Sequence, residues 1–265
     1  MPVLPSELIG TVIEFLHGDR STLCACALAS KFCLPSARYH LFSEIEVNAE
    51  NFPSFLSLIE STSHIAPSVR GLTVYGGAKI LGVRGRATPA DVFLAQNMSR
   101  VAPSLYNVIR LKIASLNWDF STLETLAHSL AAFETKVRRL ELKILRFRTF
   151  GHVTDFICYF SNLRHLDLNS VTWTSDCDPH TVRCLRMPEA LTVHTGEFLR
   201  GKSAFMLTWL HIQCPPPKLI SATFRVTEFD SRHVIPATFG ETLQILHISV
   251  FRHVSEETSG GTCTV

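Results

Sequence analysis

A short pattern, an apolar residue followed by x-x-Leu-x-apolar, recurs along the chain and constrains its fold more than any other feature. It occupies residues 69–74, 108–113, 137–142, 163–168, 207–212 and 243–248, with a degenerate copy at 190–193. Alternation of apolar and other residues over such a stretch predicts a β-strand with its leucines pointing inward. The chain is therefore expected to contain the same strand many times over.

Helix signals lie between these predicted strands. Pro53 opens a short apolar helix, and Thr88 followed by Pro89 places a capping residue and a first-turn proline at the start of another. Residues 121–124 match the Ser-x-x-Glu capping box, and residues 154–157 belong to a third helix. Alternation of strand and helix at a period of a few tens of residues indicates a repeated α/β unit with a parallel sheet.

The repeat has its best copy at residues 163–171, which match Leu-x-x-Leu-x-Leu. On this basis residues 46–254 resemble a divergent leucine-rich-repeat domain, an irregular solenoid whose parallel strands line one concave face. The unequal spacing of the copies favours the alternative, an ordinary α/β domain. Residues 255–265 have the composition of a disordered tail.

The resemblance to leucine-rich repeats implies that the residues between the leucines face the concave side and bind a target protein. Mixed charge with a tryptophan is typical of protein recognition. The predicted target-binding residues are Arg110, Lys112, Arg138, Arg139, Glu141, Arg164, Asp167, Trp209 and His211, with Arg70, Thr73, His165, Gln244 and His247 on the same face. The arginines and the lysine among them could instead bind an acidic segment or a phosphate, or simply form a solvated face.

The first forty residues predict three short apolar helices. Pro5 lies in the first turn of one that ends at Gly18, Asp19 or Ser21 caps the second, and Pro35 begins the third. A unit this small stays mostly surface, so its apolar faces must pack against the rest of the chain or against a partner.

Three segments of this region carry a family resemblance: Leu4-Pro5-x-Glu7-Leu8, then Leu-Ala-Ser-Lys-Phe at 28–32, then Ala37-Arg38-x-x-Leu41-Phe42. In this order and spacing, residues 1–45 resemble the F-box in the form found in large fungal families. The match departs from the family at residues 17–19, where the usual short acidic turn is looser, and at Phe32, where many members carry tryptophan.

The F-box resemblance implies docking to a Skp-type adaptor and, through it, to a cullin ubiquitin ligase that marks a target for ubiquitin-dependent degradation. The residues that would form or support the adaptor surface are Leu4, Pro5, Leu8, Val12, Ile13, Leu16, Leu23, Leu28 and Phe32. For each of them an internal core role is the alternative. The second reading of the whole chain is a non-ligase interaction scaffold whose first helices only cap the solenoid.

Composition limits the remaining function classes. The chain has 265 residues, of which 46% are hydrophobic and 18% charged, and its formal net charge is +2, which indicates a folded protein without strong attraction to nucleic acid or membranes. Its sequence shows no membrane-spanning run and no secretory signal, so we expect a cytoplasmic or nuclear protein. The eight cysteines are scattered and form no disulfide framework, and in a reducing compartment most are expected to be free thiols.

Catalytic and metal-binding patterns are absent from the sequence. Cys24, Cys26 and Cys33 lack the paired spacing of a zinc site. His152 and Cys158 are six residues apart, which places them on different faces of a helix. We therefore expect a recognition protein that uses no cofactor and no metal and is not an enzyme.

Overall fold

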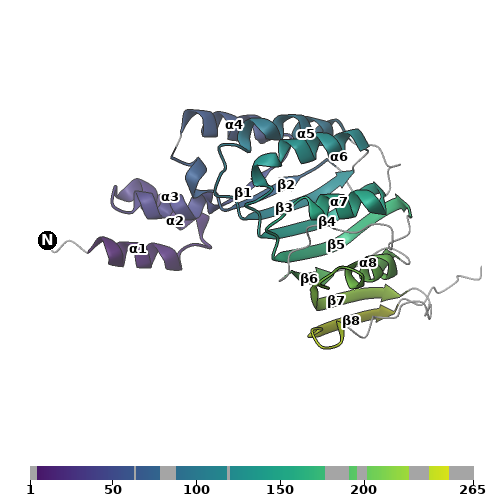
Figure 1. Ribbon diagram of the computed structural model, residues 1–265. Helices are drawn as coiled ribbons and strands as arrows, with labels where there is room; N and C mark the ends of the chain where they lie inside the picture. The colour runs from purple at the N-terminus through teal and green to yellow at the C-terminus, as the bar shows by residue number, and fades with distance from the viewer. Residues whose placement is uncertain are drawn as a thin grey trace, which may run out of the picture.

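The computed structural model describes residues 5–62, 64–77, 88–117, 120–176, 191–195, 202–226 and 239–250. It begins with three helices, α1 (Ser6–Phe15), α2 (Arg20–Ala29) and α3 (Leu34–Ser43), which we call the helical unit. The third helix leads directly into the first strand of a large sheet, and the helical unit projects from that end of the sheet (Figure 1).

Within the described residues, eight strands form one sheet in chain order, and every neighbouring pair is parallel. They are β1 (Glu44–Val47), β2 (Gly71–Tyr75), β3 (Arg110–Asn117), β4 (Arg139–Thr149), β5 (His165–Ser175), β6 (Thr192–Thr195), β7 (Lys218–Val226) and β8 (Ile245–Val250). Parallel neighbours need a crossover connection, which returns the chain to the same edge of the sheet each time.

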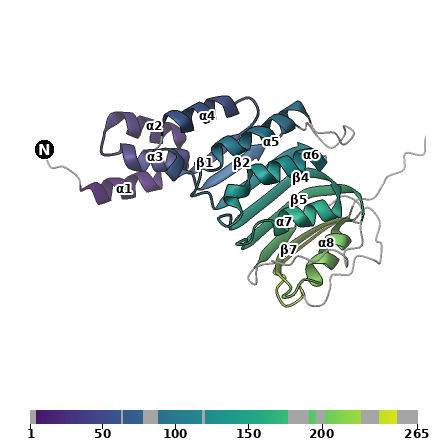
Figure 2. The same ribbon diagram turned by 45° about the horizontal axis from the view of Figure 1, so that its top comes forward.

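The crossovers contain the other helices, and these lie along one face of the sheet (Figures 1 and 2). They are α4 (Phe52–Ser61), α5 (Pro89–Val101), α6 (Phe120–Ser129), α7 (Phe150–Cys158) and α8 (Lys202–His211), with short 3-10 helices η1 (Ala66–Ser68) and η2 (Ala131–Phe133). The predicted cap of α5 is confirmed, because Thr88 and Asp91 form a capping box. The helix predicted at 121–124 is also present, although it begins at Phe120.

The predicted α/β class with a parallel sheet is confirmed. Five of the six predicted strands appear as β2, β3, β4, β5 and β8, and the degenerate copy appears as β6. The strand predicted at 207–212 is wrong, since this segment belongs to α8. Leu207 and Leu210 are three residues apart, a spacing that suits one face of a helix as well as the repeat pattern. The pattern also missed β1 and β7. The disordered tail predicted at 255–265 lies outside the described residues.

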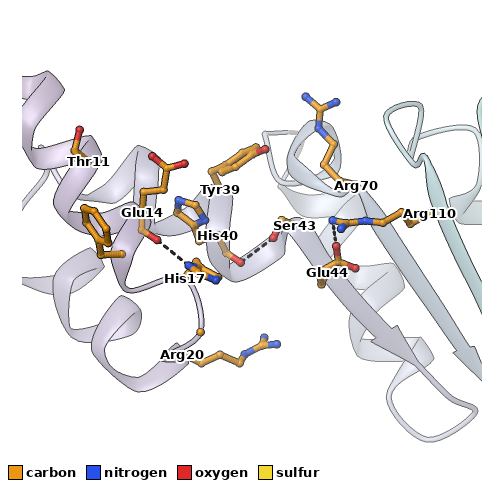
Figure 3. A pocket seen from close by; sticks show the side chains of 12 residues that line it. Thr11, Glu14, His17, Arg20, Tyr39, His40, Ser43, Glu44, Arg70 and Arg110 are labelled. Atoms are coloured by element: carbon orange, nitrogen blue, oxygen red, sulfur yellow. Dashed lines mark hydrogen bonds and ion pairs between the residues drawn. The ribbon is translucent and has the colours of Figure 1, made fainter. Parts of the chain in front are cut away.

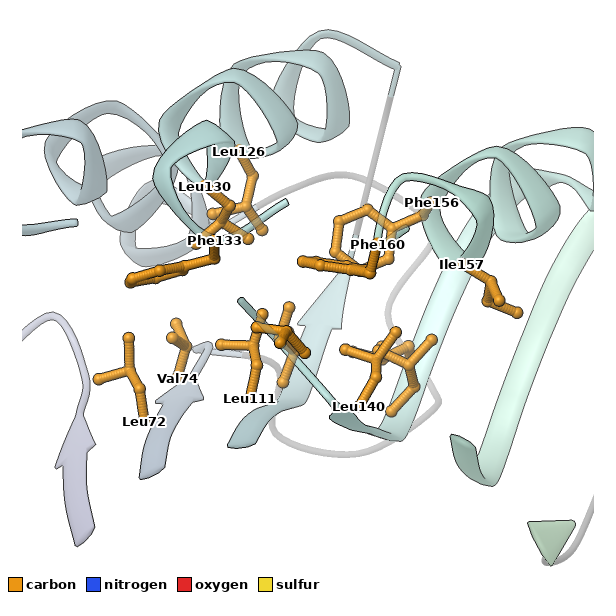
Figure 4. Packing of buried hydrophobic residues seen from close by; sticks show 14 of the residues in the cluster. Leu72, Val74, Leu111, Leu126, Leu130, Phe133, Leu140, Phe156, Ile157 and Phe160 are labelled. Carbon is orange, nitrogen blue, oxygen red and sulfur yellow. The ribbon is translucent and has the colours of Figure 1, made fainter. Parts of the chain in front are cut away.

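The core lies between the sheet and the helices. Leu72, Leu111 and Leu140 rise from successive strands and meet Phe133 and Phe160, which descend from the helical layer (Figure 4). All five side chains are at most 1% exposed. Burial of each large apolar side chain stabilises the fold by about 1.5–3 kcal/mol. The inward direction predicted for the repeat leucines is thus confirmed here, whereas Leu246 in β8 is exposed.

Three neighbouring strands share one bend. Ser115, Ile144 and Ser170 have positive φ angles of 56°, 54° and 55°, and pairing continues in register on both sides of them. Each of these residues is therefore one extra residue in the inward–outward alternation of its strand, and the three lie at the same level along neighbouring strands. The insertion keeps the next apolar side chains on the buried face: Leu116, Leu145 and Val171. Left-handed backbone is unfavourable for residues with a Cβ, so burial of these three must outweigh that cost.

Candidate functional site

The helical unit is held together by its own small core. Ile13, Leu23 and Ala37, one from each helix, are fully buried against each other and form a cluster separate from the core of the sheet. Asp19 caps α2 by accepting hydrogen bonds from the backbone N–H of Thr22 at 3.1 Å and from its hydroxyl at 2.6 Å. The Thr22 bonds, with a third from Ser21, lower the pKa of Asp19 to about 2. The unit thus has local reasons to fold.

The first helix presents two apolar stripes of which only one is buried. At 100° per residue, Ile9, Ile13 and Leu16 share a stripe that packs on α2 and α3. A second stripe, offset by about a quarter turn, consists of Leu8, Val12 and Phe15, which are 51%, 58% and 82% exposed. We call these three residues the exposed stripe. An apolar face this wide exceeds what the helical unit itself can cover.

The predicted adaptor residues divide between core and surface. Leu28 and Phe32 are 89% and 59% exposed, with Lys31 above the Phe32 ring at 5.6 Å. Pro5 is exposed, Leu16 is half-buried, and Leu4 lies outside the described residues. Ile13 and Leu23 are internal, so they support the surface and do not contact a partner directly. Phe15 was missed from the prediction although its distance from Leu8 in sequence, two helical turns, pointed to it.

A cavity of about 880 Å³ separates the helical unit from the first strands of the sheet. Figure 3 shows Glu14, His17 and His40 on its helical side and Glu44 with Arg110 on its sheet side. Within it, Nδ1 of His17 donates to the carbonyl oxygen of Glu14 at 2.8 Å, and Glu44 forms an ion pair with Arg110. The cavity is therefore polar and of mixed charge.

The sheet face opposite the helices carries rows of charged side chains. Lys112 pairs with Glu141 at 2.8 Å, and Arg139 lies 3.9 Å from Asp167. The hydrogen bond to Glu141 raises the pKa of Lys112. Burial raises the pKa of Asp167, Glu141 adds to the rise, and the cations around Asp167 oppose it. These residues are adjacent in register on β3, β4 and β5, which brings together five predicted target-binding residues: Arg110, Lys112, Arg139, Glu141 and Asp167.

Gly71 allows the pair between Glu44 and Arg110 to form across an intervening strand. Glu44, Gly71 and Arg110 are aligned on β1, β2 and β3. A Cβ at Gly71 would overlap the Glu44 carboxylate. Because Gly71 has no side chain, the Glu44 carboxylate can pass over the backbone of β2 and reach Arg110. Glu44 was not predicted to belong to the charged face because β1 itself was missed.

Four of the predicted target-binding residues lie elsewhere. Trp209 is fully buried in α8, and its ring lies 6.2 Å from that of Phe150 in an edge-to-face arrangement. His211 ends the same helix, with its ring 6.1 Å from that of Phe239. Both belong to the helical side of the sheet, so their placement on the open face is wrong. Arg138 and Arg164 precede β4 and β5 and line a different cavity at the edge of the sheet.

Metal-binding and thiol chemistry is limited among the described residues. They contain no group of three His, Cys, Asp or Glu side chains placed to hold a metal ion. Cys24, Cys26, Cys33 and Cys214 are free thiols, whereas Cys158 is disulfide-bonded, which the sequence prediction did not include. The sulfur of Cys158 is therefore not a free thiol that could act with His152. No helix in the described ranges combines the length and apolar character needed to cross a bilayer.

Comparison with known proteins adds no assignment. A scan against family models, a search of curated proteins and a search of solved structures each find no match to this chain. The geometry of the helical unit and of the charged sheet face is therefore the basis for a functional proposal.

Proposed function

We propose that the chain is the substrate-recognition subunit of a Skp/cullin/F-box ubiquitin ligase. In this proposal the helical unit is an F-box-like docking module that holds the adaptor, and the sheet is a divergent leucine-rich-repeat surface that holds the target. The observation that carries it is the exposed stripe, Leu8, Val12 and Phe15, on a helical unit that has its own core and projects from the sheet.

The exposed stripe favours docking over capping. Helices that only cap a solenoid would bury their apolar faces on the neighbouring terminal strand, here β1, because a cap exists to cover exposed core. Here α3 meets the sheet domain through η1 and β1, with Arg38 2.7 Å from His64, while the stripe on α1 remains uncovered. A contiguous exposed apolar patch on a folded unit is typical of a protein interface. Aliphatic and aromatic anchors of this kind commonly dominate binding energy.

The sheet domain supports the second half of the proposal. Its strands follow one another in chain order, all parallel, with the helices on one face. This arrangement is what stacked strand–helix repeats produce, and it leaves one face of the strands open for binding. The open face carries paired charges of both signs, which suits selection of a complementary protein surface more than a general attraction to polyanions. Affinity capture from the cytoplasm or nucleus would identify the target.

A direct binding assay tests adaptor docking. Purified full-length chain is immobilised and its retention of a purified Skp-type adaptor is measured. The double substitution Leu8→Asp with Val12→Asp should reduce affinity by at least about 100-fold, because a carboxylate enters an apolar interface only with a large desolvation cost. Both residues are more than half exposed, so the fold should survive, which thermal melting verifies.

The matched control is Val92→Asp, an apolar-to-charged change at an exposed position of α5, away from the helical unit. It should retain the adaptor like the unmodified chain. The proposal fails if the well-folded chain does not retain the adaptor, or if the Leu8 and Val12 double variant retains it with unchanged affinity.

A further inference from the structure

A second cavity, of about 310 Å³, lies at the edge of the sheet where the chain enters β2, β4 and β5. Four cationic side chains line it: Arg70, Lys136, Arg138 and Arg164. None of its described lining residues is acidic, and Glu134, in the same turn as Lys136, is not part of the lining. Its charge thus differs in kind from the mixed charge of the open sheet face.

Backbone pairing places the three arginines in one row at the start of the strands. The N–H of Arg138 donates to the carbonyl oxygen of Ile109, and the N–H of Ile109 donates to that of Arg70, each at 2.9 Å. The N–H of Arg164 donates to the carbonyl oxygen of Arg138 at 2.8 Å. Arg70, Ile109, Arg138 and Arg164 therefore occupy equivalent positions in successive units. Neighbouring rungs are separated by about 4.8 Å, so Arg138 and Arg164 are direct neighbours and Arg70 lies two rungs from Arg138. The pairing register of the strands therefore determines how the side chains of this cluster are placed.

The cluster lacks internal compensation among the described residues. Ion pairs with Glu44, Glu141 and Asp167 involve the cations of the open face and not these four. Nε of Arg70 is buried without a hydrogen-bond partner. Like charges in one pocket repel each other, and a buried N–H without an acceptor is unfavourable. An anion bound in the pocket would relieve the repulsion among the four cations.

The turns around the pocket are already fixed in place. The side-chain amide of Asn107 donates to the carbonyl oxygen of Pro67 at 2.7 Å, and that of Asn162 donates to the carbonyl oxygen of Thr135 at 2.6 Å. These bonds tie successive turns together and occupy carbonyl oxygens that would otherwise repel an anion. The pocket is thus preorganised, which reduces the entropy lost on binding.

We propose that this pocket binds a phosphate monoester dianion. Arginine presents several N–H donors in a planar fork that matches the oxygens of a phosphoryl group, and three forks with one ammonium suit a doubly charged ligand better than a single carboxylate. The inference goes beyond adaptor docking. It concerns other residues and another ligand, so either proposal can fail without the other.

Isothermal titration of the full chain with inorganic phosphate and with phosphoserine, each at constant ionic strength, tests the proposal. Acetate serves as the reference anion. The double substitution Arg138→Gln with Arg164→Gln should weaken the binding of both ligands by at least about 10-fold for each arginine removed, because a hydrogen bond to a charged group typically contributes that much to affinity. Both arginines are exposed, so the fold should be kept. Arg148→Gln, at an exposed arginine of β4 outside the pocket, is the matched control and should bind as the unmodified chain does.

Arg70→Lys separates geometry from charge. It keeps the positive charge but removes the fork and the buried Nε, so it should weaken phosphoserine while acetate binding stays the same. Equal affinity for inorganic phosphate and phosphoserine would identify the free ion as the ligand, and tighter phosphoserine binding would identify the esterified group. The proposal is overturned if neither phosphate binds more tightly than acetate, or if the Arg138 and Arg164 double variant binds like the unmodified chain.

Discussion

Leu23→Ala should destabilise the helical unit without destabilising the sheet. Leu23 is fully buried, and among the described residues it shares its small buried cluster with Ile13 and Ala37, against which partly buried side chains pack. Removal of a buried leucine side chain costs about 2–5 kcal/mol. The helices of this unit are each 10 residues long, and isolated helices shorter than about 12–15 residues are marginal in water. A loss of about 3 kcal/mol in the free energy of local unfolding raises the equilibrium constant for opening of the helical unit by about 100-fold.

Hydrogen exchange read by mass spectrometry resolves this effect along the chain. Amides of α1, α2 and α3 should lose about 100-fold in protection, whereas amides of β3, β4 and β5, which belong to the separate sheet core, should keep theirs. Leu28→Ala is the matched control, because it makes the same change in the same helix at a position that is 89% exposed. Leu28→Ala should change the stability of the helical unit by no more than about 0.5 kcal/mol.

Two results would refute this reasoning. Equal loss of protection in the sheet would mean that the two clusters unfold as one cooperative body. Equal effects of the Leu23 and Leu28 substitutions would mean that burial within the helical unit does not determine its stability.

Two further predictions concern the sheet domain. Trp209→Ala should destabilise the fold by about 3–5 kcal/mol, because a fully buried indole leaves a cavity beside Phe150. Denaturant melts measure this, and a loss below about 1 kcal/mol would contradict the internal position. Burial and Glu141 raise the pKa of Asp167, so the folded chain binds that proton more tightly than the unfolded chain and stability falls as pH rises from 3.8 through the raised pKa. The Asp167→Asn variant should therefore have a higher melting temperature than the unmodified chain at pH 7. At pH 3 the two melting temperatures should be equal. A lower melting temperature of the variant at pH 7 would contradict the direction of the pKa shift.

The strands could be predicted because their signal is local. In Leu111-x-Ile113 or Leu140-x-Leu142, alternate residues contact the helical layer, and that contact is the direct cause of the pattern. The segment around Leu207 and Leu210 shows the limit of the same argument. Two leucines three residues apart satisfy either a strand in this repeat or a helix, and only the neighbouring strands β6 and β7 decide between them.

The candidate sites depend on contacts that no local pattern contains. Leu8 and Ile13 are both apolar residues of one helix, and their different exposure follows from where α2 and α3 pack. The pair between Glu44 and Arg110 crosses a third strand, so it could be predicted only with β1 in place and the register known. Arg139 lies on the open face, whereas Arg138 and Arg164 line the cavity at the start of the strands. This difference also depends on the strand register.

The shared bend at Ser115, Ile144 and Ser170 limits how this chain can change in length. Each strand keeps its apolar residues on the buried side beyond the bend only because its neighbours bend at the same height. A residue deleted from one strand would turn the following side chains to the wrong face and leave its partners misaligned on both sides. We therefore expect insertions and deletions in natural variants of this chain to be confined to the crossovers, where length is independent of register.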